Sequence, residues 1–329
     1  MGVLLQIRDL NLDFMVDKKR IHVLNHVSLE LYEREVLAVI GETGCGKSVT
    51  GNAILRLLPD NAMVSGNILY KGADISSMSD QEFRLLRGKE IAAIPQSPGT
   101  SLNPLMRVGL QVGECVREND RKKGRDSKEI LMKVDGIFSR LRLPGGAGFR
   151  KNFPCELSVG MCQRVLISMG IIPNPNLLIV DEPTKALDWT LRKEAVELMA
   201  ELREEAKCAM MFITHDLGAA KYLADRIAVM YCGEVVEIGP AAQVINTPRH
   251  PYTQGLIASM PARGFKVMKG FMPSFQELHS GCRFSNRCEW LTGQCRETEP
   301  PMAETARGHA VKCFHWNRVA GRAGAKECC

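Results

Sequence analysis

The chain has 329 residues, 45% of them hydrophobic, so it is long enough for one large domain plus a smaller one. Its 43 basic and 37 acidic residues leave a net charge of +6, which favours a mixed solvated surface, and we expect no nucleic-acid partner. No apolar stretch approaches the roughly 20 residues that span a bilayer, and the N-terminus lacks a signal-peptide pattern, which predicts a cytosolic chain.

The first forty residues have the patterns of strands. Residues 3–7 and 27–31 alternate between apolar and polar, whereas 36–40 form the continuous apolar run of a buried strand. A Gly-rich turn follows, and then a helix predicted over 47–58 that ends before Pro59.

The middle of the chain changes to a helical pattern between about 100 and 155. Six apolar residues there are predicted to share one helix face: Ile130, Leu131, Val134, Ile137, Phe138 and Leu141. Residues 177–180 and 210–213 return to the short apolar runs of buried parallel strands. The composition shifts to Pro, Arg, His and Cys near residue 240, where we place a domain boundary.

Residues 41–48 fit the phosphate-loop pattern G-x-x-x-x-G-K-[ST]. Such a loop turns backbone N–H groups toward phosphate oxygens, while the lysine adds a point charge and the hydroxyl a ligand for Mg²⁺. A chance Gly-rich turn is the alternative, which the preceding buried strand argues against. The residues predicted to bind the nucleotide are Gly41, Glu42, Thr43, Gly44, Cys45, Gly46, Lys47, Ser48 and Val49.

Polar residues at strand ends predict the chemistry. Asp181 is expected to hold Mg²⁺ and Glu182 to act as the general base on the attacking water. His215 ends the next strand and is predicted to contact the γ-phosphate, although a lone histidine is more often structural. Gln96 is expected to orient the water and the metal. Together these residues predict an ATPase.

The order of these motifs, with the segment 157–164 and Ala186-Leu187-Asp188, resembles the ATPase subunits of ABC transporters. The resemblance implies two nucleotide domains that close head to tail, with Ser158 and Gly160 of one capping the γ-phosphate held by the other. A Ser-capped helix N-terminus suits such an anion. Phe14 is a candidate for stacking on adenine, with a core aromatic as the alternative.

The implied fold is an α/β phosphate-loop core with a parallel sheet, an antiparallel N-terminal subdomain and an inserted helical subdomain. We predict an ABC nucleotide-binding domain over 1–242, with its helical subdomain at about 97–170, and a small Cys-rich domain over 243–329.

Two positions depart from the family pattern. Val159 stands at the first glycine of the usual Leu-Ser-Gly-Gly, where a β-branched residue resists positive φ. Lys185 replaces a small Ser or Thr. Both are expected on surfaces that serve a partner's ATP, which predicts a heterodimer with one altered composite site.

The C-terminal part resembles the oligopeptide/dipeptide/nickel branch of ABC importers, through residues 248–256 and 101–104 and through four spaced cysteines. These are Cys282, Cys288, Cys295 and Cys313. Four thiolates can hold a [4Fe–4S] cluster or zinc; the wide spacing favours the cluster, and unligated cysteines are a further alternative. His279 stands where the family tends to have Pro, while Cys328 and Cys329 lie outside the pattern.

The resemblance implies ATP-driven uptake of peptides, or of nickel and its chelates, from the cytoplasmic face of the membrane. The expected partners are two membrane permease subunits, a second ATPase subunit and an extracellular solute-binding protein. The alternatives are a soluble ABC ATPase outside transport, and an ATPase regulated by a redox-sensing cysteine tail.

Overall fold

The computed structural model describes residues 2–119, 127–185, 189–206, 208–278 and 280–319. The chain forms two compact units: residues 1–76 together with 212–329, and residues 77–211. The mixed α/β class predicted from the sequence is confirmed in the elements of both units. The predicted limits at 242 and at 97–170 do not coincide with this division and stay predictions.

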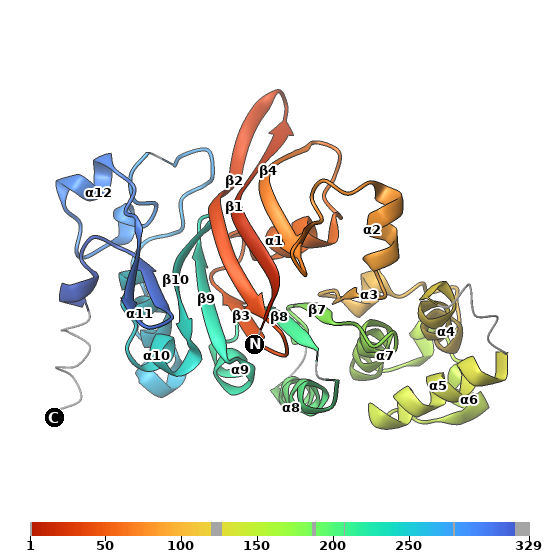
Figure 1. Cartoon of the computed structure of the whole chain (residues 1–329). Coiled ribbons are helices and arrows are strands. Elements are labelled where there is room, and N and C mark those ends of the chain that lie inside the picture. The colour runs from red at the N-terminus through yellow and green to blue at the C-terminus, as the bar shows by residue number, and fades with distance from the viewer. Residues whose placement is uncertain (1, 120–126, 186–188, 207, 279, 320–329) are drawn as a thin grey trace. The chain divides into compact units, whose positions relative to one another are not determined.

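An antiparallel sheet in the order β2-β1-β4-β5 forms the N-terminal part of the first unit (Figure 1). Its strands are β1 (Val3–Val16), β2 (Lys19–Tyr32), β4 (Ala62–Tyr70) and β5 (Ala73–Asp74). The turn between β1 and β2 has positive φ at Asp17 and Lys18, 49° and 62°, which suits the twist of a two-residue hairpin. The strands expected at 3–7 and 27–31 are therefore parts of one longer hairpin.

A second sheet of the first unit runs in the order β11-β12-β10-β9-β3. The buried strand β3 pairs in parallel with β9, and β9, β10, β12 and β11 continue the sheet antiparallel. The bounds are β3 (Val36–Ile40), β9 (Arg226–Tyr231), β10 (Glu234–Pro240), β11 (Met302–Ala306) and β12 (His309–Lys312). The last two strands come from the Cys-rich tail, so the tail extends the sheet that contains β3.

Helices of the first unit are short. They are α1 (Lys47–Leu55), α9 (Leu217–Leu223), α10 (Ala241–Asn246), α11 (Pro251–Ala258), α12 (Gly293–Glu297) and the 3₁₀ turns η2 (Pro261–Arg263) and η3 (Ser285–Arg287). The prediction that α1 reaches residue 58 is wrong, because Arg56 adopts a left-handed conformation (φ 52°) that closes the helix.

The second unit contains two parallel strands, β6 (Ile91–Ile94) and β7 (Leu177–Asp181). Its helices are α2 (Asp80–Leu86), α3 (Pro98–Ser101), α4 (Val108–Asn119), α5 (Ser127–Arg140), α6 (Gly146–Arg150), the 3₁₀ turn η1 (Pro154–Glu156), α7 (Val159–Ile171) and α8 (Trp189–Ala206). The chain then enters the first unit along β8 (Ala209–Thr214), which is buried throughout. Both apolar runs predicted as strands, 177–180 and 210–213, are confirmed.

The apolar face predicted for the helix α5 is mostly correct. Ile130, Val134, Ile137 and Phe138 are buried, and so is Leu141 just beyond the end of the helix. Leu131 is 40% exposed, because at about 100° per residue it falls at the edge of the face that the other five residues share.

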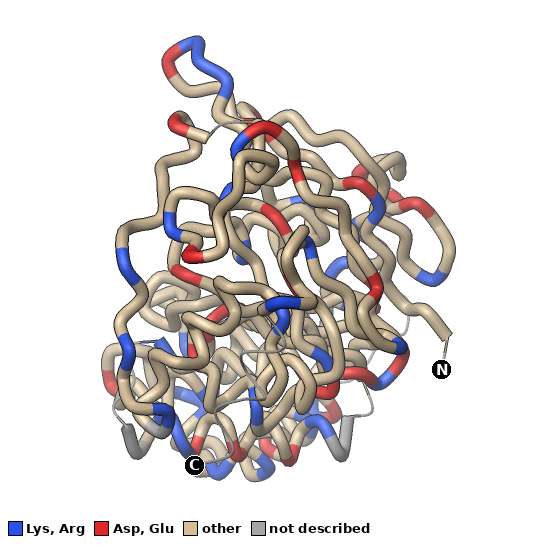
Figure 2. Tube along the Cα trace, turned by 90° about the vertical axis from the view of Figure 1, so that its left-hand side faces the viewer, with Lys and Arg blue, Asp and Glu red and all other residues tan. Residues whose placement is uncertain are grey.

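Charged residues of both signs are distributed along the trace, as the nearly balanced counts predict (Figure 2). In the part of the chain that the structure describes, no helix combines the length and the hydropathy that a membrane crossing requires.

Candidate functional site

The phosphate loop, residues 41–48, connects β3 to α1 inside the first unit. Gly41 lies so close to β9 that a Cβ there would be 2.2 Å from the carbonyl oxygen of Met230. Gly46 has φ 107° immediately before α1, where a side chain would also clash with Leu24. The glycines are thus required by backbone conformation and close packing, as the sequence pattern predicts.

Lys47 is buried, and its ammonium donates to two carbonyl oxygens of its own loop. Nζ lies 2.9 Å from the oxygen of Gly41 and 2.9 Å from that of Glu42. A buried cation bonded to neutral carbonyls retains its full charge for an anionic ligand. Ser48 follows in the first turn of α1, so hydroxyl and ammonium belong to the same helix N-terminus.

Cys45 belongs to this loop, and its side chain is fully buried, which raises the pKa of its thiol. Its carbonyl oxygen accepts a hydrogen bond from the N–H of Gly233 (2.8 Å), which fastens the loop to the turn between β9 and β10. The side chain therefore acts as a small core residue, and the backbone carries the contact.

Glu182 and Gln96 meet in the second unit. Gln96 Nε2 donates to Glu182 Oε2 at 3.0 Å, so the amide orients the carboxylate predicted to be the general base. Glu182 follows β7, is only 5% exposed and has φ 44°. A left-handed backbone at a buried glutamate is costly, which is the kind of strain found at functional positions.

Lys185 also contacts Glu182. Its ammonium lies 3.8 Å from Glu182 Oε2, although half of the lysine side chain is exposed. This departure from the family pattern places a cation beside the chain's own predicted base, and the role of Lys185 toward a partner's nucleotide stays a prediction. The adjoining residues 186–188 lie outside the described part of the chain.

Ser158 caps the helix α7, since its hydroxyl accepts from the N–H of Met161 at 3.2 Å. Gly160 in the first turn is buried, and a Cβ there would lie 3.1 Å from Leu191. The expectation that Val159 meets a positive φ is wrong, because this residue has become the first residue of the helix. The Val159 side chain is 56% exposed, so it changes the surface of the helix cap. The backbone of Val159 is helical and unstrained.

Asp181 is the last residue of β7 in the second unit, whereas His215 and Phe14 lie in the first unit. His215 is exposed directly after β8, where Asp216 caps α9 through the N–H groups of Gly218 and Ala219. Phe14 is half-buried on β1 opposite Ile21. Nothing in these positions tests their roles toward the γ-phosphate and adenine, which stay predictions.

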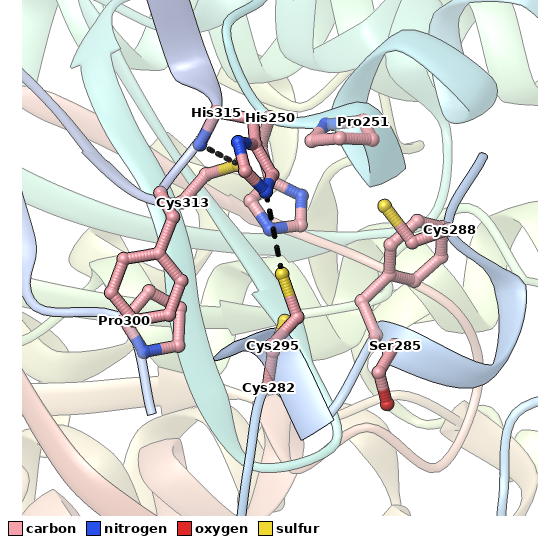
Figure 3. A pocket seen from close by; sticks show the side chains of 11 residues that line it. His250, Pro251, Cys282, Ser285, Cys288, Cys295, Pro300, Cys313 and His315 are labelled. Carbon is pink, nitrogen blue, oxygen red and sulfur yellow. Dashed lines mark hydrogen bonds between the residues drawn. The ribbon is translucent and has the colours of Figure 1, made fainter. Parts of the chain in front are cut away.

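All four predicted cysteines line one small cavity, together with His250 and His315 (Figure 3). Two of the sulfurs accept backbone hydrogen bonds from the residue two positions later: Trp290 N–H to Cys288 (3.4 Å) and His315 N–H to Cys313 (3.4 Å). Burial raises the pKa of the Cys313 thiol to about 11. Among the described residues no three His, Cys, Asp or Glu side chains converge closely enough to hold a single metal ion. His279 and Cys328–Cys329 lie outside the described residues.

Two residues that sequence reasoning missed lie against the phosphate loop. The N–H of Glu42 donates to the hydroxyl oxygen of Tyr252 (2.9 Å), and the Glu42 carboxylate pairs with Arg287 (3.0 Å). Tyr252 belongs to the segment 248–256 that identified the importer branch, and that membership was the only signal for it. Arg287 had no signal, because a contact over 245 positions leaves no local pattern.

Comparison with known proteins identifies the family. The model for the ABC transporter family matches residues 24–185, and that for the C-terminal region of oligopeptide/dipeptide transporters matches residues 236–295. The oligopeptide transport ATP-binding protein OppD of Bacillus subtilis is 38% identical over 319 residues, which cover 94% of this chain and 88% of OppD. The chain belongs to the ATPase subunits of oligopeptide/dipeptide-type ABC importers.

Other similarities agree with this family. A peptide import ATP-binding protein of Brucella ovis is 36% identical over 335 residues, covering 96% of this ABC ATPase and 98% of the relative. The dimeric ATP-binding cassette MJ0796, solved in a post-hydrolysis state with ADP and phosphate, shares the fold with a TM-score of 0.65 and 24% identity, covering 72% of this chain and 99% of MJ0796. CbiO1 of Clostridium perfringens gives a TM-score of 0.62 at 25% identity, covering 74% of this chain and 91% of CbiO1.

The family and the ABC ATPase cassette fold predicted from the motifs are thus confirmed, and the separate Cys-rich C-terminal domain stays a prediction. This ABC ATPase binds and hydrolyses ATP, a reaction that uses Mg²⁺.

Proposed function

We propose that this ABC ATPase powers the uptake of peptides through a membrane importer. The observation that carries the proposal is the similarity along nearly the whole chain, including the C-terminal region, to proteins named for peptide import and oligopeptide transport. Its partners are two permease subunits, a second ATPase subunit and an extracellular solute-binding protein, and it works at the cytoplasmic face of the membrane. Nickel or its chelates are the second candidate cargo.

Each predicted residue has a place in the reaction. Residues 41–49 hold the phosphates, and Phe14 stacks on the adenine. Ser48, Gln96 and Asp181 would hold Mg²⁺ through their oxygen atoms, and the ion would supply positive charge to the phosphates. Glu182, held by Gln96, accepts the proton of the water that attacks the γ-phosphorus, and the products are ADP and phosphate. His215 steadies the γ-phosphate, and Ser158 with Gly160 caps the ATP of a partner.

Uptake into vesicles tests the cargo. The ATPase is assembled with its permease subunits in liposomes, and accumulation of labelled peptide is compared with accumulation of nickel. ATP- and binding-protein-dependent peptide uptake is the expected result. Uptake of nickel without uptake of peptide would show that nickel is the cargo. ATP hydrolysis without accumulation of either cargo under the same conditions would contradict a transport function.

The partner ATPase subunit is proposed to be a different chain. Val159 presents a bulky exposed side chain beside the cap that Ser158 offers to a partner's phosphate. Restoring Val159→Gly should raise the ATPase rate of the assembled complex, because the composite site regains its close approach; Val267→Gly, at an exposed valine in the tail, is the control. An unchanged rate would count against an altered composite site.

The four cysteines are proposed to hold a [4Fe–4S] cluster. The residues fit such a group in two respects: four thiols line one cavity, and backbone amides donate to the sulfurs, which stabilises thiolates. A cluster binds each cysteine to a separate iron, so its ligands need not converge on one point as they must around zinc. When bound, the cluster would stabilise the Cys-rich tail, which has little hydrophobic core of its own.

A further inference from the structure

The phosphate loop is held from outside by residues that come from the Cys-rich tail. Glu42 makes both of the contacts: its backbone N–H donates to Tyr252, and its carboxylate pairs with Arg287. Met272 lies close to the same loop, since its methyl group would be 3.6 Å from a Cβ built on Gly44. All of these residues belong to the first compact unit.

Arg287 is fixed in its position. Its side chain is 5% exposed, its Nε donates to the carbonyl oxygen of Lys269 (3.2 Å), and its guanidinium packs over the rings of Tyr231 and Phe284. A buried guanidinium with several partners loses little freedom when it binds a carboxylate. The ion pair with Glu42 is therefore held in one geometry by the contacts around Arg287, whereas an exposed ion pair on the surface is mobile.

Tyr252 is equally constrained. It is fully buried, and its ring packs against Tyr231 (centroids 4.6 Å apart) and Phe284 (5.5 Å). Burial raises the pKa of the phenol, so the hydroxyl stays neutral and its oxygen can accept the N–H of Glu42. His250 orients this tyrosine, because its Nδ1 caps α11 by accepting the N–H of Tyr252 (3.1 Å).

The same tail residues border the cysteine cavity. Phe284 and His250 line that cavity, and Arg287 directly precedes Cys288. Arg283 donates to the carbonyl oxygen of Cys232 and pairs with Glu234 (3.0 Å), so it holds the turn whose Gly233 is bonded to the phosphate loop.

We infer that Tyr252 and Arg287 are positioning residues of the ATP site, which set the affinity for ATP through Glu42. The inference rests on the proposed role of residues 41–49 as the phosphate cradle. Arg287 both fixes the loop and neutralises a carboxylate that would otherwise repel the polyphosphate of ATP. The tail is thus a component of the nucleotide site in addition to any role in holding a metal.

ATP affinity of the full chain is the measurement, with a double-mutant cycle across the ion pair. Arg287→Gln should weaken ATP binding about tenfold, because it removes a charged hydrogen bond and leaves the carboxylate uncompensated. In a Glu42→Gln background the same change should have little effect, because no carboxylate remains to repel the phosphates. Tyr252→Phe should weaken ATP binding by a smaller factor.

The controls separate positioning from general loss of structure. Arg296→Gln, at an exposed arginine of the tail, and Tyr222→Phe, at an exposed tyrosine, should leave ATP affinity unchanged. Arg287→Gln should raise KM for ATP while kcat at saturation stays near wild type, measured well below the melting temperature of the variant, which loss of a buried ion pair lowers. Lys47→Ala tests the phosphate cradle itself, because it removes the ammonium of Lys47 that the proposed site uses to bind the phosphates.

Three outcomes overturn the inference. They are unchanged affinity in Arg287→Gln, an equal loss from Arg287→Gln in the Glu42→Gln background, and a loss of ATP binding no greater than the fraction of the variant that is unfolded at the assay temperature. If Lys47→Ala also binds ATP normally, the proposed phosphate cradle fails; if only Lys47→Ala loses binding, the inference fails and the cradle stands.

Discussion

Replacing Glu182 with glutamine should abolish steady-state ATP hydrolysis and leave ATP bound. An amide cannot accept the proton of the attacking water, and loss of a general base costs about 10²–10⁴ in rate. Because glutamine has nearly the same shape and its oxygen can still accept the hydrogen bond from Gln96, binding and stability should change little. Phosphate release and ATP affinity are measured on the same preparation.

Glu129→Gln is the matched control, since this exposed glutamate of α5 forms an ion pair with Lys133 on the same helix. It should leave hydrolysis intact. Hydrolysis by Glu182→Gln within about threefold of wild type would assign the base elsewhere, since that is far below the effect of a general base. A lost activity accompanied by lost ATP binding would instead give this carboxylate a structural role.

Cys288→Ser should remove most of the iron and acid-labile sulfide from a chain purified without oxygen. A [4Fe–4S] cluster takes one cysteine per iron, so wild type is expected to contain about four irons and the variant below about one. The tail should also become more sensitive to proteases, because the ligated group contributes folding energy. Metal and sulfide analysis with limited proteolysis measures both effects.

Cys155→Ser, at an exposed cysteine outside the cavity, should retain the full metal content. One zinc per chain without sulfide would establish the zinc alternative. Wild type without either metal after anaerobic purification would show that the four thiols are unligated.

Sequence reasoning predicted the elements whose cause is local. The phosphate loop, the cap at Ser158 and the buried strands 177–180 and 210–213 follow from short patterns of glycine, hydroxyl and apolar residues. The early end of α1 was missed, because Arg56 adopts a left-handed conformation that favours glycine. Val159 was misjudged because its backbone was inferred from the glycine of the family pattern.

Contacts between distant positions were beyond reach. No periodicity links Glu42 to Tyr252 or Arg287. The buried pair of Glu237 and His309, which joins β10 to the final hairpin at 2.8 Å, was equally invisible. These pairings depend on how strands and tail pack, which a single sequence does not encode in any short window.

The two supports of Glu42 have a consequence for the order in which the protein is made. Tyr252 follows Glu42 by 210 positions and Arg287 follows it by 245. At about 5–20 residues per second, a ribosome needs about 12–49 seconds to cover the longer interval, and earlier segments begin to fold meanwhile. A nascent or truncated chain therefore carries its phosphate loop without these supports, and full affinity for ATP arrives only with the last quarter of the polypeptide.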